Sequence, residues 1–166
     1  MGELSIRAFV QADEAEVTSW FADAGELRFF AGPRLTWPLD DGQWRSIRLD
    51  PSVTAWTGIL GLDQTPIGHG ELVEESPTTV RLARLAVSPR ERGHGVGRAM
   101  MIELIGEARK TGHSLMALNV HQDNTAAIRA HAERAKLALA ANNLAEAKSE
   151  YESILQLDPS DRKSVV

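Results

Sequence analysis

Residues 85–98 read LAVSPRERGHGVGR and join an apolar run to a helical one through a glycine-rich turn. The apolar run ends at Val87, Pro89 follows it, and glycine occupies every second position from Gly93 to Gly97. Glycine lets the backbone approach a ligand closely. The first N–H groups of a helix have no partner inside the helix and carry the positive end of its dipole. The turn therefore predicts a site for an anion such as a phosphate group.

Other phosphate motifs fit this turn less well. A dinucleotide fingerprint needs a glycine where Arg98 stands, and the Gly-Lys-Ser/Thr of a P-loop is absent. A plain strand–turn–helix connection, with glycines for tight packing, stays open as an alternative. Several arginines precede and follow the turn, which indicates either a basic patch for a small anion or a solvated strand end; these are Arg81, Arg84, Arg90, Arg92 and Arg98.

Composition excludes several classes of protein. The chain has 166 residues, 43% apolar and 25% charged, which is ordinary for a globular protein. The net charge of −5 argues against nucleic-acid binding. Without cysteine there is no disulfide and no thiolate nucleophile. No run is apolar enough to span a bilayer and the N-terminus lacks a signal peptide, so we expect no membrane partner and a cytoplasmic location.

Upstream of the turn, the patterns predict a strand, a helix, an aromatic stretch with a short helix, and two strands, over residues 4–10, 13–24, 29–50, 53–61 and 66–74. Asp40 or Asp41 is expected to cap the short helix. The two strands form a hairpin around Asp63-Gln64-Thr65. A further strand over residues 79–87 changes its apolar phase partway, and a β-bulge would reconcile the two phases.

Downstream of the turn, a helical stripe runs to a stop at Gly112. The apolar residues 115–120 predict a strand covered on both faces, and Asp123 or Asn124 then caps another helix. This order of elements implies a mixed sheet with helices on its faces.

Residues 85–89 and 92–97 resemble the central acetyl-CoA motif of the GNAT superfamily of acyl-CoA N-acyltransferases. In that family Q/R-x-x-G-x-G/A follows a strand that often ends Val-x-Pro. Residues 118–120 and then Asn124 resemble the family's next strand and helix. The resemblance covers about residues 3–131. It implies an α/β (α+β) fold with a mixed, mostly antiparallel sheet, in which the bulge splays two central strands.

The resemblance also implies how acetyl-CoA would bind as a co-substrate. The backbone of the bulged strand would bind pantetheine, and the Val87 N–H would polarise the thioester carbonyl. The glycine turn would hold the pyrophosphate, and Asn124 would bind near the thiol, although a helix cap is an equal alternative for it. The expected cofactor-binding residues are Leu85, Ala86, Val87, Arg92, Gly93, His94, Gly95, Val96, Gly97, Arg98 and Asn124.

Two residues are candidates for proton transfer. A protonated amine must lose a proton before it attacks, and Glu71 is the first candidate for the base, with His69 on the same strand face. Both could instead be exposed strand residues. His131 stands where the family often has a tyrosine that donates a proton to the thiolate, but a surface histidine is the alternative. The five histidines show no metal-ligand spacing.

From residue 132 the composition changes to alanine, leucine and glutamate, which favours helices. Residues 135–159 resemble a single tetratricopeptide-repeat hairpin, ending Leu157-Asp158-Pro159. We therefore expect an acetyl-CoA-binding domain over residues 1–131, truncated at its C-terminal end, and a helical hairpin over 132–166 in place of the family's last two strands. A lone repeat cannot bury its apolar face, so the hairpin covers the sheet edge, binds another protein or pairs with a second copy. A simple helical extension without a partner is the remaining alternative.

Two functions follow from these observations. The first is an acetyl-CoA-dependent N-acetyltransferase acting on a primary amine of a small molecule or protein, with residues 29–50 and 63–65 shaping the acceptor site. The second is an inactive acyl-CoA-binding or protein-interaction module, from a chimeric or truncated chain. The sequence identifies no acceptor.

Overall fold

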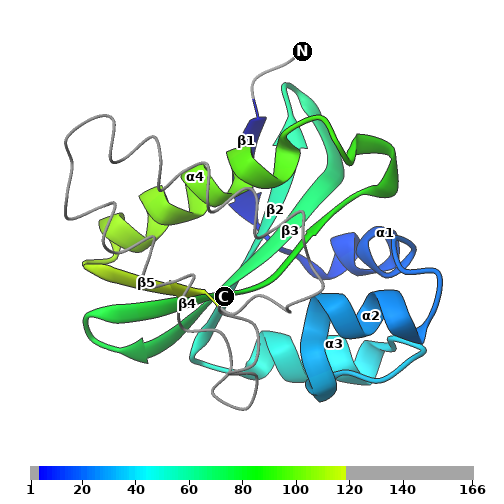
Figure 1. Ribbon diagram of the computed structural model, residues 1–166, viewed down its shortest axis with the longest axis horizontal. Helices are drawn as coiled ribbons and strands as arrows, with labels where there is room; N and C mark the ends of the chain where they lie inside the picture. The colour runs from blue at the N-terminus through cyan, green and yellow to red at the C-terminus, as the bar shows by residue number, and fades with distance from the viewer. Residues whose placement is uncertain (1–3, 119–166) are drawn as a thin grey trace, which may run out of the picture.

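The computed structural model describes residues 4–118, which form a five-stranded sheet with helices on both of its faces (Figure 1). Single turns of 3-10 helix precede α1, follow α2 and follow β4. The elements in chain order are β1 (Leu4–Ala8), α1 (Glu14–Thr18), α2 (Ala24–Ala31), α3 (Asp41–Leu49), β2 (Val53–Leu60), β3 (Asp63–Ser76), β4 (Thr79–Val87), α4 (Val96–Lys110) and β5 (Leu115–Leu118).

The strands lie in the sheet in the order in which they occur in the chain, from β1 to β5. The first four pair antiparallel, and β5 pairs parallel to β4 after the crossover through α4. The predicted mixed, mostly antiparallel sheet with flanking helices is therefore confirmed. Residues 119 and 120 of the predicted last strand lie outside the described residues, as does everything expected from residue 121 onward.

The predicted bulge in β4 is confirmed. His69 of β3 faces Ala86 and Glu71 faces Ala83, so two steps along β3 correspond to three along β4. Arg84 lies in this bulge with a φ of 46°, a left-handed conformation that costs a non-glycine residue about 1–2 kcal/mol. The extra residue shifts the alternation of side chains. Leu85 therefore packs against the same apolar cluster as the residues before the bulge.

The prediction of a single helix over residues 13–24 is wrong, because the chain leaves the helical conformation after α1 and a second helix, α2, begins at Ala24. α1 ends at Thr18. Asp23 has an extended backbone, and its side chain accepts a hydrogen bond from the Glu26 N–H. Glu26 in turn accepts one from the Ala22 N–H. This reciprocal pattern starts a new helix, and Asp-x-x-Glu was its signal in the sequence.

The hairpin between β2 and β3 turns earlier than predicted. Leu60 already pairs with Asp63, so Gly61 and Leu62 form the turn and residues 63–65 begin β3. The physical reason is the φ of 55° at Gly61, which only glycine adopts without strain. Two expected helix ends are confirmed: Asp40 caps α3 by accepting from the Gln43 N–H, and Gly112 follows α4 with a φ of 88°.

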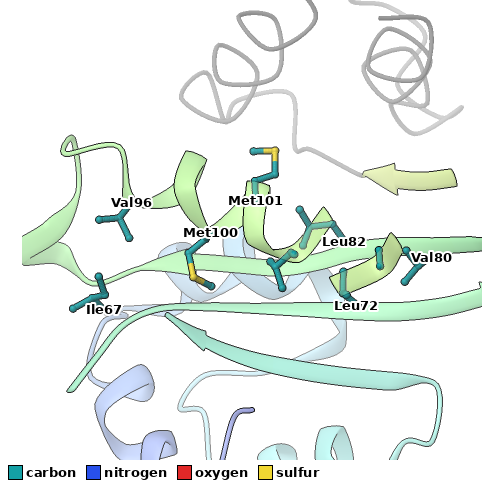
Figure 2. Close-up of a cluster of buried hydrophobic side chains, with 9 residues drawn as sticks. Ile67, Leu72, Val80, Leu82, Val96, Met100 and Met101 are labelled. Carbon is teal, nitrogen blue, oxygen red and sulfur yellow. The ribbon is translucent and has the colours of Figure 1, made fainter. Parts of the chain in front are cut away.

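Apolar side chains of α4 cover one face of the sheet, and α1 to α3 cover the other with a second cluster. Figure 2 shows Met100 directed from α4 toward the strands. The second cluster contains Trp20, Leu27 and Trp44. The sheet is thus buried on both faces.

Glycines of β2 and β3 let α4 approach the sheet closely. A Cβ added at Gly70 would lie 2.7 Å from Leu104 Cδ1 and 3.2 Å from Leu85 Cδ1, both closer than normal contact. Met100 is similarly close to Gly58 and Gly68. These glycines, which have no side chain, set the position of α4. The turn at the start of α4 is positioned with it.

We expect Gly70→Ala to destabilise the protein by about 1–3 kcal/mol, because overpacking displaces Leu104 or Leu85. Urea denaturation measures the change. Gly106→Ala is the control: Gly106 lies within α4 with nothing within 4 Å of an added Cβ. Alanine there should stabilise the helix by roughly 0.5–1 kcal/mol. Equal stability of Gly70→Ala and the unmodified chain would contradict this account of the packing.

Candidate active site

The turn between β4 and α4 leaves backbone N–H groups open at the start of α4. Gly93 and Gly95 have φ values of 81° and 82°, and Gly95 caps the helix without any side-chain hydrogen bond. Among residues 4–118, the N–H groups of Val96, Gly97 and Arg98 have no hydrogen-bond acceptor. An added Cβ at Gly93 or Gly95 would meet nothing within 4 Å, so a ligand has room there. This arrangement suits an anion.

A second open N–H group lies at the end of β4. Val87 faces Gly68, and the next residue, Ser88, donates its N–H to the Ile67 carbonyl over 2.9 Å. Because successive N–H groups of a strand point to opposite sides, the Val87 N–H is directed away from β3. In the described part of the chain β5 pairs with β4 only over Thr79–Leu82. The Val87 N–H therefore faces the side on which β4 has no strand partner, as its predicted role requires.

The side chain of Arg92 braces the turn against the helices. Its Nε donates to the Val87 carbonyl over 3.2 Å and its Nη2 to the Trp20 carbonyl over 3.3 Å, and Nη1 lies 3.7 Å from Glu26 Oε1. Arg92 therefore stabilises the path of the chain between β4 and α4. These contacts partly neutralise the guanidinium charge, so less of it acts on an anion at the turn.

The expected basic patch is smaller than the sequence suggested. Arg81 pairs with Glu75 at 2.6 Å, and Arg84 pairs with Glu71. Side chains along a strand point to alternate faces, so arginines close in sequence separate in space. Within the described residues, only Arg90 and Arg98 of the five have no side-chain partner.

His69, Glu71 and Arg84 form a buried polar cluster between β3 and β4. The first two side chains are completely buried, so the alternative that they are exposed strand residues is wrong. His69 Nε2 lies 3.1 Å from Glu71 Oε1. Arg84 donates to Glu71 Oε2 through Nε at 2.6 Å and also through Nη2. Both carboxylate oxygens are therefore occupied.

Two opposing effects set the pKa of Glu71. Burial alone would raise it, but the hydrogen bonds from His69 and Arg84, together with the charge of Arg84, outweigh burial and hold the pKa below its ordinary value. Glu71 is therefore an ionised carboxylate in the folded protein at neutral pH.

Aromatic rings from three elements enclose His69. Phe9, just after β1, and Trp44 of α3 meet it edge-on, with ring centroids 4.6 Å and 5.5 Å away. Phe30 of α2 lies at 5.8 Å. The predicted aromatic stretch 29–50 thus contributes two of the three rings. This environment is largely apolar, which strengthens the electrostatic interactions within it.

The structure places Glu71 at the bulge that precedes residues 85–87, and the glycine turn at the start of α4. It does not describe Asn124 or His131, whose roles stay predictions. His94 is exposed in the turn. Sequence analysis missed Arg84 as the partner of Glu71. Its signal was present, because a bulge turns one side chain of the strand to the opposite face.

The described residues contain no metal-type cluster of side chains and no membrane-crossing helix. No three side chains of the metal-ligating types gather there. No helix there has the length and apolar content needed to cross a membrane.

Residues 15–135 match the acetyltransferase (GNAT) family, and the chain belongs to that family. It is 37% identical over 74 residues to an L-2,4-diaminobutyric acid acetyltransferase from Nocardia farcinica, a match covering 43% of this chain and 38% of that protein's length.

Solved structures show the same fold. A spermidine N-acetyltransferase from Vibrio cholerae, in complex with CoA and spermine, superposes with a TM-score of 0.65 at 16% identity, over 79% of each chain. A GNAT family acetyltransferase from Elizabethkingia anophelis with acetyl-CoA bound gives 0.55 at 12% identity, over 79% of this chain and 74% of that one.

The lowered pKa of Glu71 predicts how stability depends on pH. A carboxyl group with a lowered folded-state pKa adds stability above its unfolded pKa, and that stability is lost as the pH falls through the folded value. Glu71→Gln should therefore be less stable than the unmodified chain at neutral pH. The difference should shrink as the pH drops below the ordinary value of 4.5. Urea denaturation at a series of pH values measures it.

Glu75→Gln is the matched control, because Glu75 pairs with Arg81 at the surface, where an ion pair contributes little. Its stability should follow that of the unmodified chain at every pH. Parallel curves for Glu71→Gln and the unmodified chain would show that the buried carboxylate is not the source of the pH dependence.

Proposed function

We propose that this chain is an acetyl-CoA-dependent N-acetyltransferase, which moves an acetyl group to a primary amine of a small molecule or protein by direct attack on the thioester. The observation that carries the proposal is the pair of open backbone sites on either side of one turn. Gly95 and the first turn of α4 offer N–H groups to phosphate, and Val87 offers one to the thioester carbonyl. Membership of the acetyltransferase family supports this assignment.

Each part of the site has a distinct proposed role. The N–H groups of residues 93–97 would hold the pyrophosphate, and the backbone at Leu85–Val87 would hold pantetheine. Acetyl-CoA supplies the activated acetyl group. The Val87 N–H would stabilise the negative charge that develops on the carbonyl oxygen during attack. Beyond the described residues, Asn124 would bind near the thiol and His131 would donate a proton to the thiolate.

The acceptor would lie on the face of the sheet covered by α1 to α3. The two relatives described above are named for acetylation of diaminobutyric acid and spermidine, and both of these carry primary amines. Phe30 and Trp44, from the variable aromatic stretch, pack around His69 on this face. Glu71 with His69 is the proposed base, since these are the buried titratable groups beside β4.

Binding and turnover together test the proposal. CoA should raise the melting temperature of the protein, and acetyl-CoA should be consumed with at least one member of a panel of diamines, diamino acids and lysine peptides. Gly95→Glu should abolish the stabilisation by CoA, because it places a negative charge where phosphate would bind.

Gly61→Glu is the matched control, since Gly61 also has a positive φ and open space but lies at the β2–β3 turn. It carries the same conformational cost and should keep CoA binding. Stabilisation by CoA without turnover would point to the acyl-CoA-binding module instead. A protein that CoA does not stabilise would contradict both functions.

A further inference from the structure

One nitrogen of the buried cluster has no hydrogen-bond partner in the described part of the chain. His69 Nδ1 is inaccessible to solvent and has no hydrogen-bond partner among residues 4–118, whereas Nε2 faces Glu71. A buried polar atom without a partner destabilises the folded state. Such atoms are few in native proteins and each calls for an explanation.

The geometry of the pair determines which nitrogen carries the proton. Glu71 is an ionised carboxylate and can only accept a hydrogen bond. When the ring is neutral, Nε2 is therefore the nitrogen that carries the proton, and Nδ1 keeps a free lone pair. That lone pair makes Nδ1 a base.

Glu71 itself is badly placed to take up a proton. Oε1 accepts from His69, and Oε2 accepts twice from Arg84. The same contacts lower the pKa of Glu71, which weakens it as a base. These contacts favour His69 as the base over Glu71, which was the first candidate from the sequence.

We propose that His69 Nδ1 accepts the proton of the acceptor amine, and that Glu71, held by Arg84, is the positioning residue that fixes the ring. This inference rests on the proposed acetyl transfer and names the group that removes the proton from the amine. A carboxylate behind an imidazole sets its orientation and stabilises the imidazolium once formed, as in other carboxylate–histidine pairs.

The proton balance is complete without a further reactant. An ammonium group gives one proton to Nδ1, directly or through one water molecule, and becomes a neutral amine. The amine nitrogen bonds to the acetyl carbon, and the carbon–sulfur bond breaks. The second proton lost by nitrogen goes to the CoA thiolate, and His69 later releases its proton to solvent. The products are an amide, CoA and one proton.

The position of His69 suits this step. It pairs across the strands with Ala86, the residue before Val87, so the ring lies one strand away from the proposed carbonyl site. Its contacts with β1, α2 and α3 are aromatic rings, and the charged groups at the cluster are Glu71 of β3 and Arg84 of β4. Phe9 and Phe30 are only half-buried, and under this proposal an amine or a water molecule reaches Nδ1 past these two rings.

The test compares pH profiles of kcat/KM for the amine that the full chain acetylates best. His69→Gln should lower kcat/KM at neutral pH by about 100-fold or more, the usual contribution of a general base. Its rate should then rise only at the pH where the free amine itself forms. Glu71→Gln should keep the pH-dependent rise of kcat/KM but shift it to lower pH, because no carboxylate then stabilises the imidazolium form. His113→Gln, outside the cluster after α4, should leave the profile unchanged.

Stabilisation by CoA shows whether each variant is folded. An unchanged profile in His69→Gln, or loss of the pH-dependent rise in Glu71→Gln alone, would overturn the inference and leave the acetyltransferase proposal intact. Absence of turnover in the unmodified chain would instead defeat the proposed function. If a variant does not fold, ¹⁵N NMR of the unmodified protein decides: a proton on Nε2 supports the inference, and one on Nδ1 refutes it.

Discussion

The ion pair between Glu71 and Arg84 ties β3 to β4 at the point where the register between them changes. Because Glu71 is fully buried, its charge is tolerable only with a partner inside the protein. The bulge supplies that partner by turning Arg84 toward Glu71. The same extra residue keeps Leu85 against the α4 cluster. One local distortion therefore serves both faces of the sheet.

The two faces divide the proposed work. On the side of α4, glycines in the strands bring the helix close, and the position of the helix fixes the open turn that follows β4. On the other side, Phe9 after β1, Phe30 of α2 and Trp44 of α3 surround His69 with aromatic rings. The end of β4 connects the two faces. The Val87 N–H points away from β3, and Arg92 bridges the Val87 carbonyl and the Trp20 carbonyl between α1 and α2. The proposed phosphate site and the proposed base thus lie toward opposite faces of the sheet, and β4 connects them.

Sequence patterns predicted the features that depend on neighbours along the chain. The phase shift in residues 79–87 indicated the bulge, and Asp40 and Gly112 were identifiable as helix ends. The hairpin turn was misplaced because polar residues 63–65 look like a turn, although the left-handed φ belongs to Gly61. The burial of His69 had no local signal. A polar residue on a strand is normally exposed, and its enclosure depends on aromatic rings brought from three distant elements.

The buried pair also constrains how this protein can change over evolutionary time. Loss of either Glu71 or Arg84 alone would leave an uncompensated charge in the interior, at a cost of about 3–5 kcal/mol. That is a large share of the stability of an ordinary domain. Replacement of both by apolar residues could be nearly neutral, but the route passes through a damaged intermediate. Lineages should therefore retain or lose the two residues together, and an Arg84 without its glutamate would mark a chain that has compensated elsewhere.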